Sequence, residues 1–300
     1  MMRRRTASCL IIALLAGACR EVSDARPSRI VGPQILALEA EPPEAAPGAS
    51  VSYHVLAVDR GGSLEPTLGM QLAYCRTPKP LTDNRVASDA CAEASEQPFA
   101  GASESLEGVV PSDTCALFGP NVPATDRPPD PDSTGGYYQP VRVEIESLAA
   151  VGLQRIRCPL ANAPIDVALA FRDRYVANQN PVLLPLLATI DGKAVELSDI
   201  PRDRDVQLAL GWPAESAERF VVFDLATATL AEQRESMRVS WFVTDGELSY
   251  DRTGRAADDF ALRTENSWHS PGTAIRAHLW VVLRDSRGGT THASYDLEVR

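Results

Sequence analysis

The chain has few basic residues, and beyond its first five positions they are spread out. Of its 300 residues, 40 are Asp or Glu and 29 are Lys or Arg, which gives a net charge of −11. Lysine occurs only as Lys79 and Lys193. Binding to nucleic acid or to anionic lipid headgroups depends on clustered cations. The composition therefore argues against both as partners.

The sequence also lacks the short motifs that mark common catalytic sites. It contains no G-x-S-x-G, no H-E-x-x-H, no P-loop and no G-x-G-x-x-G. Its four histidines are scattered, and its cysteines show no C-x-x-C spacing of the kind that binds zinc. We therefore expect a protein that is not an enzyme and that has no cofactor and no metal site.

Long hydrophobic runs are missing as well. The apolar run Ala7–Leu15 is too short to span a bilayer, which needs roughly 20 such residues. Three arginines precede the run and the small residues Ala16-Gly17-Ala18 follow it, which is the layout of a secretory signal peptide. We expect residues 1–18 to be that peptide and Cys9 to be removed with it.

Cys19 follows the small residues directly, and residues Leu15–Cys19 resemble the lipobox of bacterial lipoproteins. In that family the cysteine is lipidated and becomes the first residue of the mature chain. The resemblance implies a lipid anchor at Cys19, and ordinary cleavage after Ala18 is the alternative. Arg20 stands where enterobacterial members carry an Asp that retains them at the inner membrane, so the resemblance favours the outer membrane. The polar residues 19–33 would then form a tether.

The other cysteines fit an exported chain. An even number of them in an oxidising compartment predicts two disulfides, which sequence alone can connect in three ways. We favour the two pairs in which each bond ties a long loop to a strand. The four candidates, paired in this order, are Cys75 with Cys91 and Cys115 with Cys158.

Residues 34–178 are expected to form a first β-domain. Alternating apolar residues place Val51, Tyr53, Val55 and Ala57 on one face of a strand. Periodicity is lost over residues 78–140, which are rich in Pro, Ser, Asp and Gly, so we predict a long irregular insertion stapled by the disulfides. The other strands predicted here are 35–38, 70–75, 141–145 and 165–171.

Residues 181–300 are expected to form a second β-domain, after a boundary at Asn178–Pro181. Its clearest feature is a hairpin whose strands, 275–283 and 293–299, flank a turn at Asp285–Gly289. Strands at this spacing, separated by turns, predict an antiparallel β-sandwich. The other strands predicted here are 183–190, 206–212, 220–223 and 237–244, with Asp-Gly turns at 191–192 and 245–246.

The second domain resembles PKD-type and related bacterial Ig-like domains. The resemblance rests on Trp241–Gly246, Ser270–Thr273, Leu279–Asp285 and Gly288-Gly289. It implies an all-β fold with two antiparallel Ig-like sandwiches, the first carrying the insertion. Tandem Ig-like domains behind a lipobox resemble uncharacterised surface lipoproteins of Gram-negative bacteria, in which such domains act as spacers or binding modules.

These features predict an exported, lipid-anchored envelope protein of rod-like shape that presents or spaces an interaction surface for a protein or glycan. The alternative is an adhesion or glycan-binding module that uses the loops of the second domain, with or without calcium. Calcium binds six to eight oxygen ligands, usually from loop carboxylates. The candidate ligands form two sets: Asp126, Asp130 and Asp132; and Asp245, Asp251, Asp258 and Asp259.

Overall fold

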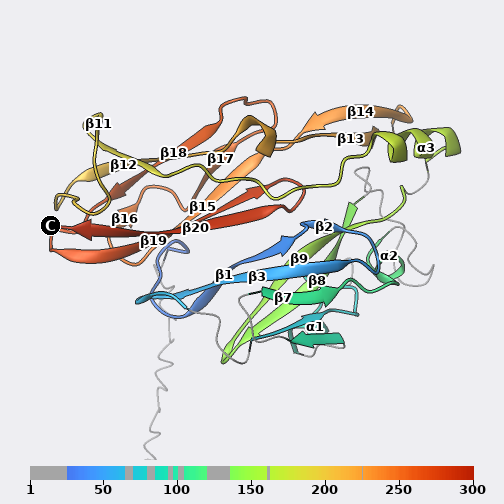
Figure 1. The fold of residues 1–300 in the computed structure, drawn as a ribbon, viewed down its shortest axis with the longest axis horizontal. Coiled ribbons are helices and arrows are strands. Elements are labelled where there is room, and N and C mark those ends of the chain that lie inside the picture. The colour runs from blue at the N-terminus through green and yellow to red at the C-terminus, as the bar shows by residue number, and fades with distance from the viewer. Residues whose placement is uncertain are drawn as a thin grey trace, which may run out of the picture.

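Two antiparallel β-sandwiches make up the described part of the chain, with the second lying along the first (Figure 1). The computed structural model describes residues 26–64, 70–79, 85–93, 97–100, 105–119, 136–160, 163–224 and 226–300. Most of the elements in these residues are strands, and the helices are few and short, so the predicted all-β class is confirmed. The expected signal peptide and Cys19 lie outside the described residues.

The first sandwich has the strand order of an immunoglobulin domain. Strands β1, β3 and β7 take positions A, B and E in one sheet, while β5, β8 and β9 take positions C, F and G in the other. Two short strands, β4 and β2, extend the sheets, and β6 pairs with β5. The bounds are β1 Gln34–Glu41, β2 Glu44–Ala45, β3 Ser50–Asp59, β4 Gly62–Ser63, β5 Gln71–Tyr74, β6 Gln97–Ala100, β7 Ser105–Val109, β8 Gly136–Ile145 and β9 Leu148–Arg157.

The second sandwich has the same order. Strands β10, β12, β18 and β16 take positions A, B, E and D, and β15, β19 and β20 take positions C, F and G. A hairpin, β13–β14, is inserted between positions B and C. The bounds are β10 Leu187–Ile190, β11 Lys193–Ala194, β12 Asp205–Gly211, β13 Arg219–Asp224, β14 Thr229–Arg234, β15 Met237–Val243, β16 Glu247–Leu248, β17 Arg252–Arg255, β18 Arg263–His269, β19 Ile275–Asp285 and β20 Thr290–Val299, with a 3-10 helix at Ala214–Ser216.

The alternating patterns of the second half correspond to buried strand faces. Val206, Leu208 and Leu210 of β12 are buried, and each is separated from the next by a more exposed residue. Asp191 and Gly192 both have positive φ, 49° and 77°, as a two-residue hairpin turn of type I′ requires. Local sequence therefore determined both the strand faces and this turn.

One predicted strand is wrong. Residues 165–171 begin a helix, α3 (Ile165–Arg174), and do not form a strand. The helix starts after Pro164, carries Asp166 in its first turn, and has basic residues in its last turn, as helix termini favour. The alternating apolar residues do not mark a buried face, because Ile165 is 81% exposed and Phe171 alone is buried.

The insertion predicted at residues 78–140 is more regular than expected. It contains the helices α1 (Asp89–Glu93) and α2 (Thr114–Leu117), as well as β6, β7 and the first half of β8. Strand β7 completes a sheet by pairing with β3. The chain forms disulfides between Cys75 and Cys91 and between Cys115 and Cys158, so the expected disulfide bonds are confirmed in the favoured pairing.

Candidate functional site

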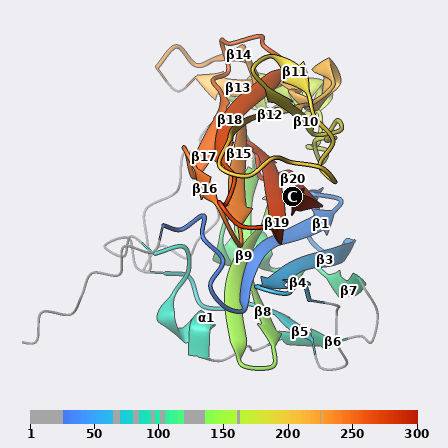
Figure 2. The same cartoon turned by 90° about the vertical axis from the view of Figure 1, so that its left-hand side faces the viewer.

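The two sandwiches pack along their sides through a small apolar core of their own. Trp280 and Val282 of β19 share this core with Leu56 and Val58 of β3, and its other buried members are Ile30 and Ala37. Figure 2 shows β1 and β3 next to β19. The expectation of a rod is therefore wrong, because a rod would place the two domains end to end.

The strands at this junction are buried on both faces. In β19, Leu279, Val281 and Leu283 point into the core of the second sandwich, while Trp280 and Val282 point into the junction. An unbroken apolar run is typical of a strand covered on both sides. The run Leu279–Leu283 is of this kind, and the expectation of a single buried face for this strand is incomplete.

The end of the predicted tether belongs to the junction. Ile30 is fully buried, and its N–H donates to the carbonyl of Val243 over 2.9 Å. The N–H of Val243 donates in turn to the carbonyl of Ser28 over 2.8 Å. Residues 26–30 therefore lie against the second sandwich, so this part of the expected tether is fixed.

A buried arginine organises the polar half of the junction. The Arg287 side chain is 1% exposed and donates from Nε to Glu235 over 2.7 Å and from Nη2 to Glu218 over 2.9 Å. Its Nη1 donates to the carbonyl of Val176 over 2.8 Å, and its guanidinium lies 4.6 Å from the centre of the Phe220 ring. Because every donor nitrogen has an acceptor, the charge can be buried.

A second buried ion pair lies in the first sandwich. Arg155 donates from Nε to Glu44 over 3.1 Å, and both side chains are at most 2% exposed. The Tyr175 hydroxyl donates to the same carboxylate over 2.7 Å. This pair lies next to the linker that leads into the second sandwich.

Asn178 joins the two ion pairs. Its backbone N–H donates to Glu44 over 3.1 Å, while its side-chain Nδ2 donates to Asp285 over 3.2 Å. Asp285 accepts the backbone N–H of Arg287 over 2.8 Å. A continuous chain of buried polar contacts therefore runs from one sandwich to the other. Sequence reasoning identified Asn178 only as part of a boundary.

Two acidic residues of this chain, Glu235 and Asp285, have raised pKa values. Burial and the nearby carboxylate of Asp285 raise the pKa of Glu235 to about 7, against the opposing effect of Arg287. Burial raises the pKa of Asp285 to about 6. The folded protein consequently binds protons at these groups at a pH where the unfolded chain has released them.

We expect the protein to be more stable at pH 5 than at pH 8. A carboxyl group whose pKa is higher in the folded protein than in the unfolded chain stabilises the fold at a pH below its unfolded-chain pKa. That stability is lost as the pH rises through the folded-state pKa values of about 6 and 7. The expected difference in the free energy of unfolding is on the order of 1–3 kcal/mol. Urea denaturation across this range measures it. Glu235→Gln, which cannot ionise, should flatten the profile, and a wild-type stability that rises towards pH 8 would contradict the assignment.

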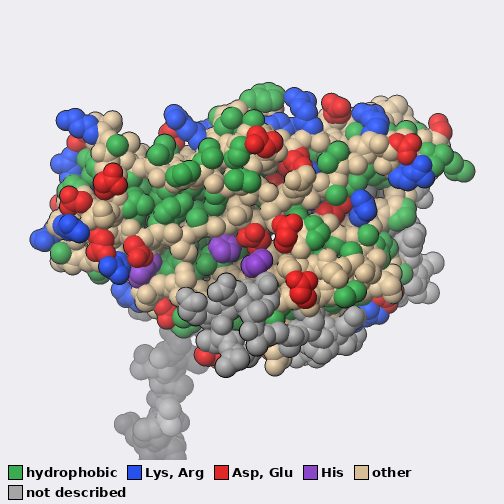
Figure 3. Space-filling view, viewed as in Figure 1, with side chains coloured by type: hydrophobic (Ala, Val, Ile, Leu, Met, Phe, Trp, Pro, Cys, Tyr) green, Lys and Arg blue, Asp and Glu red, His purple; other side chains and the backbone are tan. Residues whose placement is uncertain are grey.

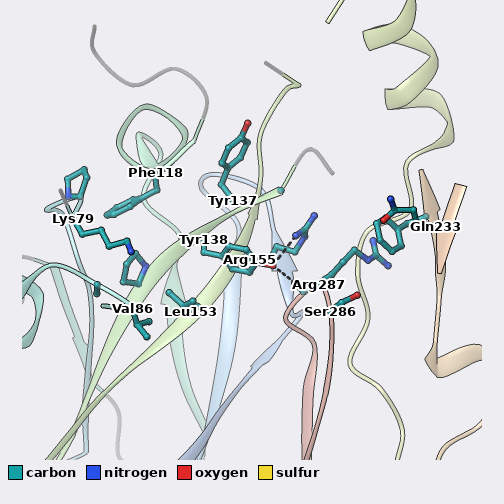
Figure 4. Close-up of a pocket in the computed structure, with 15 residues that line it drawn as sticks. Lys79, Val86, Phe118, Tyr137, Tyr138, Leu153, Arg155, Gln233, Ser286 and Arg287 are labelled. Atoms are coloured by element: carbon teal, nitrogen blue, oxygen red, sulfur yellow. Dashed lines mark hydrogen bonds between the residues drawn. The ribbon is translucent and has the colours of Figure 1, made fainter. Parts of the chain in front are cut away.

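A pocket of about 610 Å³ lies beside this network (Figure 4). Arg155 and Tyr138 line it from the first sandwich, and Arg287 and Phe220 line it from the second. The Tyr138 hydroxyl accepts a hydrogen bond from Arg155 and donates one to the carbonyl of Arg287, both over 3.2 Å. The polar wall of the pocket thus holds the sandwiches together.

The second set of carboxylates considered for calcium, near Asp245 and Asp259, does not form one site. Asp245 is 3.3 Å from both Arg29 and Arg60, Asp259 pairs with Arg255 over 3.2 Å, and Asp251 accepts the Ser28 hydroxyl. Within the residues that the structure describes, no group of three or more His, Cys, Asp or Glu is placed to hold a metal ion. Asp258 is exposed near Asp259, and the set Asp126, Asp130 and Asp132 lies outside the described residues.

Two of the histidines, His54 and His292, lie beside the same carboxyl group, that of Glu39. His278 hydrogen-bonds to Asp296 over 2.7 Å, and His292 lies 3.7 Å from Glu39.

Among the described helices, none has the length and apolar character needed to cross a membrane.

Comparison with known proteins does not place the chain in a family. No protein-family model matches it, and no curated protein matches it. Solved structures that align with it include the Yersinia pseudotuberculosis adhesin InvE, at 10% identity and a TM-score of 0.23 over 88% of this chain and 60% of that one. The C-terminal domain of the Streptococcus pyogenes antigen I/II-family protein AspA aligns at 8% identity and a TM-score of 0.24, over 91% of this chain and 100% of that one. Since these scores are too low to carry an argument, the immunoglobulin-like assignment rests on the strand order.

Proposed function

We propose that this protein is a lipid-anchored protein of the cell envelope that presents an interaction surface to a partner and catalyses no reaction. The partner is a protein or a glycan, and the anchor is the lipidated Cys19. The outer membrane is the proposed location, on the resemblance of residues 15–20 to a lipobox.

The observation that carries the proposal is the buried junction between the two sandwiches. A buried apolar core and a buried polar chain hold the two sandwiches in one orientation. Domains within a chain otherwise tend to move relative to each other. Fixing them supports a presenting role, because a partner that contacts both sandwiches need not immobilise them on binding.

The disulfides support the exported location. Such bonds persist in oxidising compartments and are rare in the cytosol, where thiols are kept reduced. Both pairs lie in the first sandwich, Cys75 with Cys91 and Cys115 with Cys158. They tie the short helices α1 and α2 to the ends of β5 and β9.

Cys19→Ala tests the anchor. We expect the wild-type protein in the membrane fraction and the variant in the soluble fraction, because two acyl chains anchor a protein durably and removal of the cysteine removes both. Immunoblotting of the separated fractions measures this. Cys9→Ala, within the same apolar run, is the matched control and should leave the protein at the membrane. A Cys19→Ala variant that stays in the membrane pellet would rule out the lipid anchor.

Cross-linking in intact cells tests the presenting role. A photoreactive residue on the exposed face of the second sandwich should capture one defined partner, identified by mass spectrometry. The same residue introduced on a distant face should not capture it. A protein that yields no specific cross-link from any face would refute the proposed function.

A further inference from the structure

Among the residues that the structure describes, partners of the outer edge of β20 are found only at its two ends. Along its other side β20 pairs with β19 over its whole length, from Thr290 to Val299. Near the C-terminus, the N–H of Glu298 donates to the carbonyl of Leu197 over 2.8 Å, and Ile200 donates back to Glu298 over 2.9 Å. At the other end, the N–H of Thr290 donates to the Asn180 side chain over 2.9 Å.

Between these ends three residues direct unpaired backbone groups outward. In an antiparallel ladder every second residue points its N–H and C=O away from the neighbouring strand. Thr290 and Glu298 point outward, and so therefore do His292, Ser294 and Asp296. Within the described part of the chain, no hydrogen bond reaches the backbone groups of these three residues. This edge of the sheet can therefore pair with one more strand.

This edge opens into a surface groove of about 590 Å³. One wall is the extended segment Asn180–Pro185, and the other includes Glu39 of β1. Val182 and Leu184 are 56% and 43% exposed along the first wall. Figure 3 shows this face, with apolar side chains gathered over the second sandwich and histidines beside acidic side chains below them. The groove therefore offers an apolar wall together with a polar one.

We propose that the open edge of β20 accepts an extended peptide segment of a partner protein as an additional strand. The inference rests on the proposed function and specifies the class of partner. Such strand addition takes its affinity from main-chain hydrogen bonds and its specificity from alternate side chains. The three outward residues supply the hydrogen bonds for a segment of about five or six residues.

The two walls define the sequence of that segment. Ala293 and Tyr295 face the core side of β20, so peptide residues opposite them lie beside Leu183 and are apolar. The peptide residue opposite His292 lies on the side of Glu39 and His54, and these polar groups favour a polar residue there. The partner segment consequently alternates apolar residues with polar ones.

The position of the edge favours a single peptide chain over a second copy of this protein. Edge strands that must stay unpaired usually carry lysine, proline or a bulge, and residues 291–297 have none of these. The edge is, however, recessed between Asn180–Pro185 and Glu39. A lone extended segment fits between these walls, whereas the sheet of another folded molecule would meet them first.

Amide hydrogen exchange of the detergent-solubilised full chain tests the site. In the free protein we expect the amides of His292, Ser294 and Asp296 to exchange rapidly and those of Ala293 and Tyr295 slowly, because only the latter bond to β19. The probes are peptides selected against this protein from a random displayed library. Bound peptides should protect the three fast amides and should alternate apolar residues with polar ones.

A matched pair of variants tests the same hydrogen bonds. Ser294→Pro removes an N–H that makes no bond to β19, and proline is tolerated at such edge positions. Peptide affinity should fall roughly tenfold or more, because the variant loses the hydrogen bond from the Ser294 N–H to the peptide and the proline ring occupies space beside it. Ser294→Ala keeps the N–H and should bind as the wild type does. If Ser294→Pro does not fold, the protection pattern in the wild type decides the question.

Each contrary result has a distinct meaning. Peptides that bind Ser294→Pro unchanged, or that protect other amides, overturn the edge assignment and leave the proposed function intact. A library that yields no binding peptide also overturns the edge assignment. A dimer that Ser294→Pro dissociates, measured by sedimentation, overturns it in favour of a second copy. Failure of the proposed function is read separately, from the absence of any cross-linked partner in the envelope.

Discussion

Replacement of Arg287 by methionine is expected to lower the free energy of unfolding by about 3–5 kcal/mol. Methionine has a similar length but cannot donate hydrogen bonds. The change leaves Glu235, whose side chain is fully buried, and the carbonyl of Val176 without their partner. A buried charge that has lost its partner is among the costliest defects in a folded protein. Urea denaturation at pH 8 measures the loss.

The pH dependence of this loss separates an electrostatic cause from simple loss of packing. At pH 5 the loss should be smaller, because Glu235, with its pKa of about 7, takes up a proton and no longer needs a cation. Arg204→Met is the matched control, since Arg204 pairs with Asp191 while their side chains are 48% and 78% exposed. Its effect should stay below about 1 kcal/mol. An Arg287→Met variant whose loss is equally small would contradict the role assigned to the buried pair.

Strand β12 could be predicted together with its buried face because it has one face in a core and the other more exposed. The alternation of its residues reflects this directly, so position in the sequence was enough to assign the buried face. The turn at Asp191-Gly192 could be predicted for a similar reason, because its conformation depends on two adjacent residues. Such features are local, and local sequence determines them.

The helix α3 was missed because period-2 alternation of small apolar residues can also occur in an exposed helix. Ile165, Val167 and Leu169 suggested a strand face, although none of the three is buried. The stronger local evidence lay at the ends of the segment, in Pro164 before it and in the two arginines of its last turn. Capping signals therefore carried more information here than hydrophobic alternation did.

The junction could not be predicted by the same reasoning. Glu44 and Asn178 are 134 residues apart, and Asn178 and Asp285 are 107 residues apart. No pattern within a short window couples such positions, and a buried carboxylate looks like an exposed one in the sequence. The one available clue was the unbroken apolar run in β19, which requires a cover on each face.

The open edge of β20 illustrates the same limit. The sequence predicted the hairpin that contains it, and the hairpin is present with continuous pairing along both strands. Whether the far side of β20 is covered depends on Leu197–Ile200 and Asn180, which lie about a hundred residues earlier in the chain. Edge pairing is therefore a property of the assembled sandwich, and residues 291–297 alone could not reveal it.

Trp280→Ala is expected to destabilise the protein by about 3–5 kcal/mol and, in addition, to uncouple the two sandwiches. Trp280 is 1% exposed in the junction core, and its Nε1 donates to the Ser63 hydroxyl of the first sandwich over 2.9 Å. Removing it leaves a cavity between the two domains, and the cores of both remain intact. The sandwiches should then unfold at different urea concentrations.

The distribution of tryptophan makes this uncoupling measurable. All four tryptophans belong to the second sandwich, so fluorescence reports its unfolding alone, while far-ultraviolet circular dichroism reports both sandwiches. The two curves should coincide in the wild type and separate in Trp280→Ala. Trp241→Ala is the matched control, because Trp241 is equally buried but lies within the second sandwich. It should cost a similar free energy and shift mainly the fluorescence curve to lower urea. Coincident curves in Trp280→Ala would show that the polar chain through Asn178 is sufficient to couple the sandwiches without the apolar core.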